Sequence, residues 1–366
     1  MDKDLIYKIA LTQILGIGSV LAKSLVGYCG GVKEVFSKSK SFLQKSPGVG
    51  EKVASNIKGF SDFSAAESEV KFIQEHNIKT TFFLDKDYPY RLRNIPDCPI
   101  LLYSRGDISF SPERIIAIVG TRKITEYGRQ FVKRIVEDLK PYNPTIVSGM
   151  AYGVDILAHK ECLKNDVPTI GVVAHGLDRL YPDLHKKVAS EMIQKQGAEL
   201  TEYSSGTRPN RENFPMRNRI VAGLVDAVIV VESARKGGSL ITAELANQYN
   251  RDVLALPGDF GRDSSAGCNS LIKNHKANLI EGAEDIVQLL NWDILQESKN
   301  QPKLFVELSS NEELVLNILK DTGSVGIDSL SSQLKMSPSL LAVILLELEM
   351  KNCIISLPGK RYQCVN

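Results

Sequence analysis

Short apolar runs and amphipathic helical segments alternate through the middle of the chain. The clearest run is IIAIV at 115–119, which is apolar at every position. A strand that is apolar on both faces is typical of a parallel sheet covered by helices on both sides. We therefore expect an α/β fold with right-handed crossovers and a Rossmann-like, mainly parallel sheet. The predicted strands are 115–119, 145–148, 169–173, 199–202, 227–231 and 252–256, and the predicted helices include 129–140, 153–165, 185–196 and 242–248.

The N-terminal pattern is helical. Residues 5–57 contain two similar turns, LGIG at 15–18 and PGVG at 47–50, and a further amphipathic helix is predicted at 62–77. Both turns resemble the helix-hairpin-helix turn, in which backbone N–H groups at a helix N-terminus contact a phosphate without reading base sequence. A small SAM-like helical bundle in which the glycine turns only pack is the alternative, and the sequence leaves the two open.

A proline-rich connector joins this region to the predicted sheet. A short strand is expected at 80–84, and a second one at 100–103. Between them, Pro89, Pro96 and Pro99 predict an extended segment without helix, because proline lacks the backbone N–H and restricts the residue before it.

The C-terminal region has the order of a winged helix. A polar segment at 291–302 precedes it, and three helical patterns are then followed by a hairpin. These elements are predicted at 312–320, 327–335, 337–351, 354–357 and 362–365. The last helix carries Glu347 and Glu349 and no arginine, so we expect it to contact protein rather than a DNA groove. The wing could still touch a DNA backbone through three cations, Lys351, Lys360 and Arg361.

Composition is that of an ordinary globular chain. The 366 residues are 43% apolar and carry a formal charge of +2, so any nucleic-acid surface must be a local patch. Without an apolar run of about 18 residues or a signal peptide, we expect a cytoplasmic protein with no membrane segment. The six cysteines have no C-x-x-C pair, which predicts reduced thiols and no metal site.

Four parts are predicted: a helical domain at 1–80, a sheet domain at 81–292, a linker at 293–305 and a winged-helix domain at 306–366.

The carboxyl ends of the predicted strands are rich in glycine and polar residues. In an open parallel sheet the ligand crevice lies at these ends. Glycine lets the backbone approach a ligand, and the helix that follows directs its positive N-terminus there, so these turns predict an anion site. The candidates are Gly120, Thr121, Arg122, Ser148, Gly149, Met150, Ala151, Gly153, Gly238 and Ser239. At Gly120 alone, a tight turn without a ligand is the alternative.

A long loop at 203–215 adds cations and an aromatic ring to the same edge. Arg211 and Phe214 lie in it, and Arg217 and Asn218 follow. Arginine holds phosphates, and an aromatic ring stacks with a base for about 1–3 kcal/mol without sequence preference. These residues therefore favour single-stranded nucleic acid. The alternative for Arg217 and its neighbour Arg219 is an ion pair with acids such as Asp226 or Glu232, which we expect for one of the two.

These motifs together resemble the DprA/Smf family of DNA-processing proteins. The resemblance covers about 88–290 and rests on YPYRLRNIPDCPILLYSRG, VGTR, SGMAYGVDILAH, GLDRLYP, FPMRNRIVAGL, GGSLITAELA, and LPG followed by GCNSLI. It implies a homodimer without cofactors that binds single-stranded DNA, protects incoming strands during natural transformation and loads the RecA recombinase.

The resemblance also implies roles for individual residues. Arg122, Ser148, Gly149 and Gly153 would line a phosphate pocket, Arg211 would be the basic residue before the stacking aromatic Phe214, and Arg217 and Asn218 would form the RN pair. The position of Arg211 is often lysine in this family, so a forked cation replaces a point charge here; we expect it to keep the phosphate contact with an altered geometry.

An enzyme is the main alternative to a binding protein. The segment GGSLITAE at 237–244 is similar to the PGGxGTxxE signature of nucleotide phosphoribohydrolases of the lysine-decarboxylase-like group, in which an acid assists cleavage of a base from a ribose phosphate. Here Ser239 and Leu240 replace the x-Gly step. Glu244, Glu232 and Asp155 are the acids at hand, and no nucleophile and base stand at a recognisable spacing. We therefore expect a non-catalytic protein. A scaffold with a vestigial site is the third reading.

Overall fold

A computed structural model describes residues 3–292, 308–322, 325–351, 353–357 and 361–364. The chain divides into two compact units, residues 1–295 and 296–366, and each is considered by itself. The predicted linker at 293–305 lies outside the described residues. The division into four parts stays a prediction.

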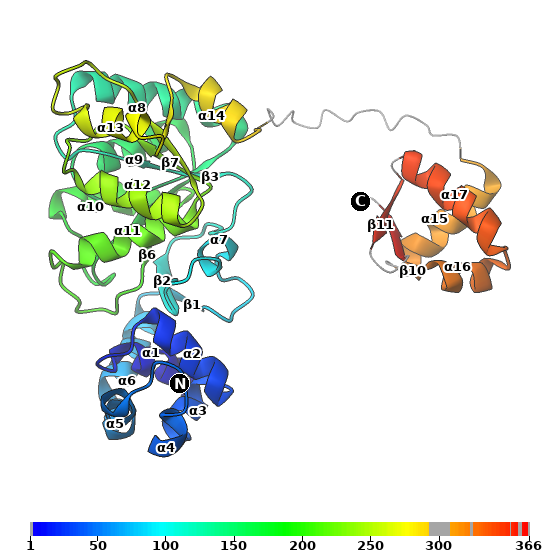
Figure 1. Ribbon diagram of the computed structural model, residues 1–366, viewed down its shortest axis with the longest axis horizontal. Helices are drawn as coiled ribbons and strands as arrows, with labels where there is room; N and C mark the ends of the chain where they lie inside the picture. The colour runs from blue at the N-terminus through cyan, green and yellow to red at the C-terminus, as the bar shows by residue number, and fades with distance from the viewer. Residues whose placement is uncertain (1–2, 293–307, 323–324, 352, 358–360, 365–366) are drawn as a thin grey trace. The chain divides into compact units, whose positions relative to one another are not determined.

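One sheet organises the described part of the first unit (Figure 1). Its order is β1-β2-β6-β5-β4-β3-β7-β8-β9, parallel from β6 to β9, with β1 and β2 antiparallel at one edge. This confirms the mainly parallel α/β fold. The short strand β9 and the antiparallel edge were not predicted. The strands are Lys79–Phe82, Leu101–Arg105, Ile115–Val119, Thr145–Ser148, Thr169–Val172, Gly197–Thr201, Ala227–Val230, Asp252–Ala255 and Asn278–Leu279, from β1 to β9.

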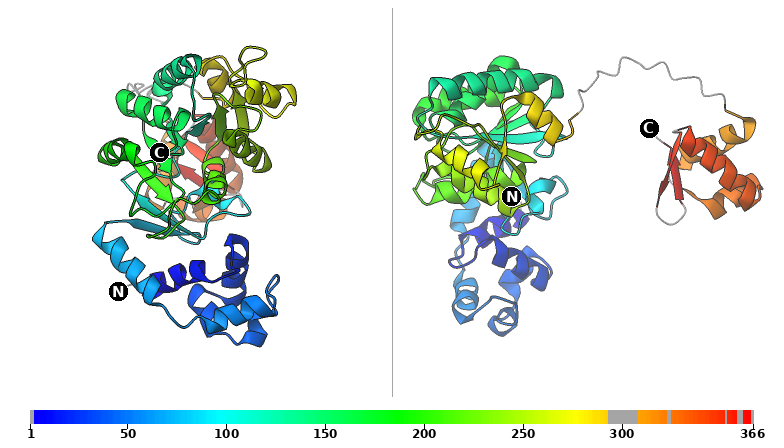
Figure 2. Two further views of the ribbon diagram at one scale, coloured as in Figure 1. Left: turned by 90° about the vertical axis from the view of Figure 1, so that its left-hand side faces the viewer. Right: turned by 45° about the horizontal axis from the view of Figure 1, so that its top comes forward.

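Helices cover both faces of the sheet (Figure 2). Alternate side chains of β3 separate into two cores, as the pleat of a strand requires. Ile115 and Ala117 pack in one core with the helices α11 and α12, whereas Ile116 and Ile118 pack in the other with α8 and α9. The helices of the sheet region are α8 Glu126–Leu139, α9 Val154–Asn165, α10 Lys186–Gln194, α11 Asn213–Leu224, α12 Gly238–Gln248, α13 Ala266–Lys273 and α14 Ala283–Leu289, with short 3₁₀ turns at Lys140–Tyr142 and Asp183–His185.

The N-terminal helices dock against the antiparallel edge of the sheet, below β1 and β2 in Figure 1. Their buried side chains share one core with Phe82 and Tyr103 of the edge strands. Two polar contacts reinforce this packing, since Lys23 donates to the Pro96 carbonyl oxygen at 2.6 Å and Glu69 accepts from the Ser205 backbone N–H at 2.9 Å. The helices are α1 Lys3–Gln13, α2 Ser19–Cys29, α3 Val32–Ser37, α4 Lys40–Leu43, α5 Glu51–Gly59 and α6 Ser64–Glu75.

The connector between β1 and β2 corrects one prediction. It contains a short helix, α7 Tyr90–Arg93, where the prolines predicted an extended segment only. Pro89 is the N-cap of this helix, and Pro96 and Pro99 come after its last turn. Proline at a helix start removes no helical hydrogen bond, so prolines on both sides bound this helix rather than prevent it.

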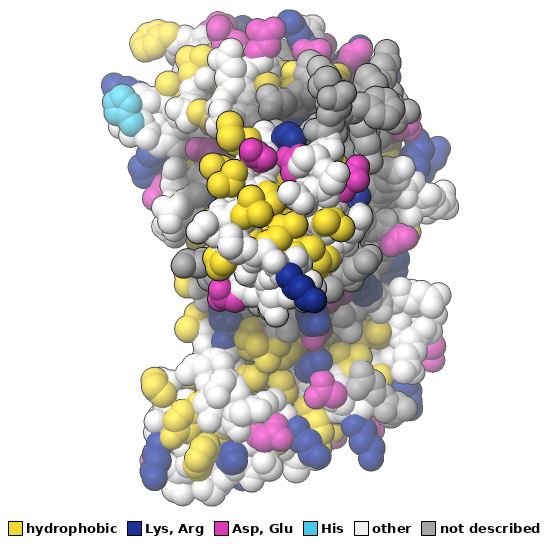
Figure 3. All heavy atoms as spheres, turned by 90° about the vertical axis from the view of Figure 1, so that its right-hand side faces the viewer, with side chains coloured by type: hydrophobic (Ala, Val, Ile, Leu, Met, Phe, Trp, Pro, Cys, Tyr) yellow, Lys and Arg dark blue, Asp and Glu magenta, His cyan; other side chains and the backbone are white. Residues whose placement is uncertain are grey.

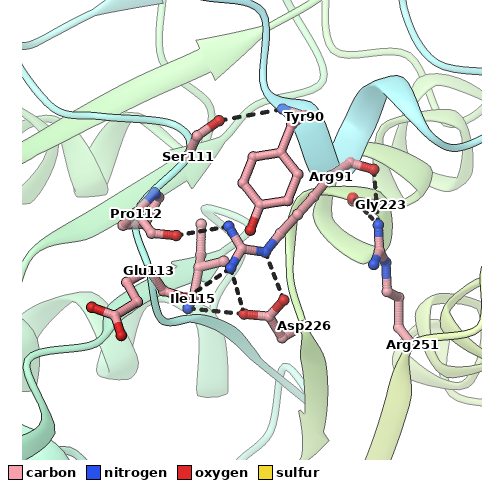
Figure 4. Close-up of polar contacts among 9 residues, drawn as sticks. All are labelled: Tyr90, Arg91, Ser111, Pro112, Glu113, Ile115, Gly223, Asp226 and Arg251. Atoms are coloured by element: carbon pink, nitrogen blue, oxygen red, sulfur yellow. Dashed lines mark hydrogen bonds and ion pairs between the residues drawn. The ribbon is translucent and has the colours of Figure 1, made fainter. Parts of the chain in front are cut away.

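Arg91 of α7 ties the connector to the sheet (Figure 4). Its side chain is buried, and its Nε and Nη2 donate to the two oxygens of Asp226 at 2.6 and 2.8 Å. The guanidinium also donates to the carbonyl oxygens of Pro112 at 2.7 Å and Glu113 at 2.8 Å. On the other side of α7, Arg251 Nη2 donates to the Arg91 carbonyl oxygen at 2.8 Å.

The second unit is a winged helix, as predicted. Its elements are α15 Ser310–Thr322, β10 Val325–Gly326, α16 Ile327–Leu334, α17 Pro338–Met350, β11 Ile354–Leu357 and β12 Arg361–Cys364, with the sheet order β10-β12-β11. The strand β10 was not predicted. Lys351 pairs with the buried Glu312 at 2.7 Å, which makes it a structural residue of this unit. The side chains of Lys360 and Arg361 lie outside the described part of the chain.

The helix α17 leaves an apolar surface exposed. Leu340, Val343, Leu346 and Met350 are exposed on it, and apolar side chains gather on the face of this unit shown in Figure 3. No single helix among the described residues is long and apolar enough to cross a membrane; the bent pair α16 and α17 meets that test only when the two are taken together. The opposite face of α17 supplies Leu341, Leu345 and Leu348 to the core of the winged helix.

Candidate nucleic-acid interface

The order of the strands places a crevice between β3 and β7. From β3 the chain proceeds to β4, β5 and β6 on one side, and it then returns to continue with β7 and β8 on the other side. The loops that leave β3 and β7 therefore diverge, which opens a crevice at the carboxyl ends of the strands. A cleft of about 770 Å³ lies there, and we call it the switch-point cleft. It is lined by Val119, Gly120, Thr121, Arg122, Gly149, Ala151, Asp155, Tyr181, Pro209, Arg211, Phe214, Pro215, Arg217, Asn218, Val221, Ser233, Ala234, Gly237, Gly238, Ser239, Ile241 and Thr242.

Two glycines bring the loops after β3 and β4 into contact. Gly153 has φ 80°, and a Cβ at this position would collide with the Thr121 carbonyl oxygen. This close approach lets the Val154 backbone N–H donate to the same oxygen at 3.1 Å, so the start of α9 holds the turn after β3. A Cβ at Gly149 would collide with Asp155 and with the guanidinium of Arg217. Gly153 is therefore required by the backbone around it, whereas Gly149 leaves room for the two side chains that meet there.

Arg122 and Phe214 form one wall of the cleft. The guanidinium carbon of Arg122 lies 5.8 Å from the centroid of the Phe214 ring, and the Tyr181 ring lies 6.1 Å from that centroid. Phe214 is half-buried in the first turn of α11, whereas Arg122 and Arg211 are exposed. Neither arginine forms an ion pair with a carboxylate of the described residues. Two forked cations and two aromatic rings thus face the same space.

Arg217 and Asp155 form the floor. Arg217 is only 5% exposed, and its Nη1 donates to the Val172 carbonyl oxygen, while its Nε has no hydrogen-bond partner among the described residues. Asp155 accepts from the Ala151 backbone N–H at 3.3 Å. Burial raises the pKa of the Asp155 carboxyl and lowers that of Arg217, and each charge opposes the shift of the other. The floor therefore holds the loop after β4 and presents one buried N–H without a partner.

Comparisons with known proteins place this chain in a family. A family model described as DNA recombination-mediator protein A matches residues 79–291, which is more than half of the chain. The chain belongs to the DprA family. A second model, the DprA winged helix domain, matches residues 300–360, in agreement with the fold of the second unit. The resemblance drawn from the sequence motifs is thereby confirmed.

Relatives and solved structures of the DprA family resemble most of the chain. Protein Smf of Synechocystis sp. is 36% identical over 302 residues, which are 81% of this chain and 75% of that protein. The DNA processing protein DprA of Bacillus subtilis is 39% identical over 218 residues, 59% of this chain and 73% of that protein. Among solved structures, DprA of Streptococcus pneumoniae matches with a TM-score of 0.69 at 30% identity, covering 79% of this chain and 98% of that one. DprA of Helicobacter pylori, whose structure concerns its single-stranded DNA binding mode, matches with a TM-score of 0.53 at 31% identity over 58% of this chain and 95% of that one.

Most of the residues predicted for the site of this DprA-family chain line the cleft. They are Gly120, Thr121, Arg122, Gly149, Ala151, Arg211, Phe214, Arg217, Asn218, Gly238 and Ser239. Three lie outside its lining. Ser148 is fully buried and its hydroxyl donates to the Ile118 carbonyl oxygen at 2.6 Å, whereas Met150 lines a small adjoining cavity of about 40 Å³ and Gly153 lines a separate groove. For all fourteen residues, a role in DNA binding stays a prediction.

Some lining residues were not among the predicted site residues. Tyr181 follows β5, and an aromatic residue at the carboxyl end of a predicted strand was a signal that could have revealed it. Ser233 accepts a hydrogen bond from Ser239 at 2.9 Å, which links the end of β7 to the start of α12. Thr242 and Ile241 line the cleft one turn later in α12, and a helical spacing from Gly238 would have placed them there.

The acidic partners of the arginines differ from those we expected. Arg219 is committed to an ion pair, but with Glu202 rather than with Asp226 or Glu232. Asp226 instead binds Arg91. Glu232 accepts from the Thr125 backbone N–H at 2.9 Å and from its hydroxyl at 2.5 Å, so it holds the start of α8. Arg217 has no such pair within 4.0 Å among the described residues and stays at the cleft.

Catalytic acids are poorly placed in the cleft. Glu244, the acid suggested by the glycine-turn signature, is exposed, pairs with Lys276 at 2.7 Å and is not among the residues that line the cleft. Asp155 is the one carboxylate among the described lining residues, and it is buried beside Arg217. No three His, Cys, Asp or Glu side chains of the described residues come together as a metal site requires. The expected absence of catalysis, metal and cofactor stays a prediction.

His159 contacts the loop that carries Gly149 of the cleft, and its titration makes the stability of the first unit depend on pH. Its ring is fully buried, with Nε2 2.8 Å from the Gly149 carbonyl oxygen and Nδ1 2.7 Å from the Thr169 hydroxyl. In the neutral ring, Nε2 donates to the Gly149 carbonyl oxygen, and the single proton of the Thr169 hydroxyl is shared between Nδ1 and the Ile146 carbonyl oxygen, which lies 2.9 Å from that hydroxyl. Burial lowers the pKa of His159 from 6.5 to about 4.

We expect acid to destabilise the first unit through His159. Between pH 6.5 and pH 4 the unfolded chain takes up a proton that the folded chain does not, so stability falls as the pH drops through this window and is unaffected above it. At pH 5 the loss is about 2 kcal/mol. The check is urea unfolding at pH 7.5 and pH 5, followed by the fluorescence of Trp292, which is the single tryptophan and is buried in the first unit. His159→Gln should remove this part of the pH dependence, whereas His76→Gln on the surface should keep it; equal pH dependence in His159→Gln and the wild type would contradict the assignment.

Proposed function

We propose that this chain is a non-catalytic protein that binds single-stranded DNA in the switch-point cleft and acts in DNA recombination. The observation that carries the proposal is the meeting of exposed Arg122 and Arg211 with the Phe214 ring at the topological switch point. Arginine forks hold phosphates, and an aromatic face stacks with any base. Membership in the DprA family and the likeness to a DprA whose structure concerns single-stranded DNA binding support the same ligand.

The cleft favours a single strand over a duplex. The turns after β3 and β4 line the cleft with Gly120, Thr121, Arg122 and Gly149, and the Phe214 and Tyr181 rings lie beside Arg122. A base can reach these rings only when it is not paired and stacked inside a double helix. The phosphate contacts themselves would not distinguish the two forms, because both carry the same backbone charge.

The test is the anisotropy of a labelled oligo-dT against a matched duplex, titrated at two salt concentrations. The wild-type protein should prefer the single strand, with an affinity that falls steeply as salt rises. Equal binding of both forms, or no binding, would remove the basis of the proposal. The control variant is Lys133→Ala/Arg134→Ala, on the exposed face of α8 outside the cleft, which should bind both forms as the wild type does.

Phe214→Ala separates stacking from charge. We expect the affinity for oligo-dT to fall about 5- to 160-fold, which corresponds to about 1–3 kcal/mol for one stacked base. The slope of affinity against salt should stay unchanged, because a ring releases no counterions. Phe260→Ala is the matched control, since Phe260 is fully exposed and does not line the cleft. A lower salt slope in Phe214→Ala would mean that the ring acts by positioning Arg122 rather than by stacking.

We also propose the finer roles that membership in the family supports: a cytoplasmic homodimer that protects incoming DNA during natural transformation and loads RecA onto it. Loading is tested by the DNA-dependent ATPase activity of RecA on single strands coated with a single-strand-binding protein. Adding the wild-type chain should shorten the lag of this activity. Sedimentation equilibrium tests the dimer. A monomer at micromolar concentration, or an unchanged lag, would contradict the corresponding role.

Absence of catalysis is the remaining part of the proposal. The ion pair of Glu244 with Lys276 and the burial of Asp155 beside Arg217 leave no free carboxylate among the described lining residues to assist cleavage of a base from a ribose phosphate. Incubation of nucleoside monophosphates with high protein concentrations should release no free base by chromatography. Release that is lost in Glu244→Gln would establish the phosphoribohydrolase alternative instead.

A further inference from the structure

A second depression adjoins the switch-point cleft at Arg122. It has a volume of about 400 Å³, and we call it the basic groove. It is lined by Arg122, Lys123, Ile124, Arg129, Tyr152, Gly153, Ile156, Leu157, Lys160 and His185. Arg122 lines both the groove and the cleft, so the two meet at this side chain. Tyr152 lines both the groove and the small cavity beside Phe214. None of the side chains known to line the groove is acidic.

The charge of the groove departs from that of the whole chain. The sequence has 45 Lys and Arg against 43 Asp and Glu, so a lining with four cations and no carboxylate is a local concentration of positive charge. Lys123, Arg129 and Lys160 are exposed, and none of them forms an ion pair within 4.0 Å with a carboxylate of the described residues. These cations are therefore available to an anion from solution.

The groove also offers surface for bases. Tyr152 is 44% exposed, and its ring packs edge-on against His185 at 4.9 Å between ring centroids. His185 is itself fixed, with Nδ1 2.8 Å from the Met150 carbonyl oxygen. Ile156 and Leu157 of α9 add apolar surface beside this ring. Cations together with an exposed ring and apolar surface suit a chain of nucleotides better than they suit an isolated inorganic anion.

We infer that the basic groove binds the nucleotides next to those in the switch-point cleft, so that a single strand leaves the cleft past Arg122 and runs between the start of α8 and α9. The inference rests on the proposed function and extends it, since the groove has no role there. Lys123, Arg129 and Lys160 contact successive phosphates, and Tyr152 supports a base. Binding therefore depends on strand length, because a short strand fills the cleft and only a longer one reaches the groove.

The test compares two labelled oligo-dT strands of about four and about twelve nucleotides on the full chain. The variant is Lys123→Ala/Arg129→Ala/Lys160→Ala. Its matched control is Lys133→Ala/Arg134→Ala/Lys164→Ala, which removes the same charge from α8 and α9 outside the groove. The groove variant should bind the longer strand about 10- to 100-fold more weakly, with a salt slope lower by about 2, and should bind the short strand as the wild type does. The control should bind both strands as the wild type does.

The outcomes distinguish the inference from the proposed function. Wild-type affinity of the groove variant for the longer strand would overturn the inference alone and leave the groove to another anion, such as an acidic protein segment. Equal losses for both strand lengths, or an equal loss in the control, would also overturn it, since the charges would then act at a distance. No binding of either strand by the wild type would overturn the proposed function, and the inference with it. Tyr152→Ala keeps every charge. It should lower the affinity for the longer strand about fivefold or more and leave the slope of affinity against salt unchanged.

Discussion

Arg91→Ala is expected to destabilise the first unit by about 3 kcal/mol. Breaking a buried ion pair by removing one partner costs about 3–5 kcal/mol, because the other charge is left without compensation. The side chain of Asp226 is 31% exposed, so water can solvate it in part, which places the loss at the lower end. The carbonyl oxygens of Pro112 and Glu113 lose their donors as well. Urea unfolding followed by Trp292 fluorescence measures the loss, because this tryptophan packs in the core between the sheet and α8.

Two variants identify the cause of that loss. Arg91→Lys keeps the charge but not the fork that reaches Asp226 and both carbonyls, so it should recover only part of the stability. Arg134→Ala breaks the exposed pair with Asp138 and should change stability by about 0.5 kcal/mol or less. If Arg91→Ala and Arg134→Ala lower the free energy of unfolding equally, the contacts of Arg91 do not stabilise the packing of the connector on the sheet.

The sheet could be predicted because its strands are apolar on both faces. The run at 115–119 becomes β3 with every residue buried, and glycine turns at its carboxyl end mark the ligand edge. Local signals also explain what was missed. Strand β9 has two exposed residues and no apolar pattern, and α7 is too short to show a helical period between its prolines.

The polar pairings could not be predicted, because they depend on the order of strands in space. Arg91 and Asp226 are 135 positions apart, and they meet only because α7 and the start of β7 reach the same end of the sheet. Both arginines are buried, but Arg219 forms an ion pair with Glu202, just after β6, whereas Arg217, two residues earlier, lines the cleft. A helix turns about 100° per residue, so two positions separate these arginines onto different sides. The sequence predicted that one of the two arginines forms an ion pair, but it could not identify the acid that pairs with it.

Arg122→Ala/Arg211→Ala should weaken oligo-dT binding by about 3–4 kcal/mol, which is about 100- to 1,000-fold. Each charged hydrogen-bonding group contributes about 1.5–3 kcal/mol when it contacts a phosphate, and the two side chains reach the cleft from different loops. The slope of affinity against salt should fall by about 1.4, since each contact on a single strand releases about 0.7 of a counterion. Anisotropy titrations at three salt concentrations measure both quantities. Lys133→Ala/Arg134→Ala removes the same charge outside the cleft and should leave both unchanged.

Lysine substitutions distinguish the two arginines. Arg211 is exposed and contacts no ring or carboxylate among the described residues, so Arg211→Lys should bind the strand nearly as the wild type does. Arg122 lies over the Phe214 ring, where a planar guanidinium can stack and still direct its N–H groups toward a phosphate. A lysine ammonium is a point charge without that plane, so Arg122→Lys should keep the salt slope but lose about fivefold or more in affinity. Equal behaviour of the two lysine variants would mean that Arg122 contributes charge alone, and that the ring and the cation act independently.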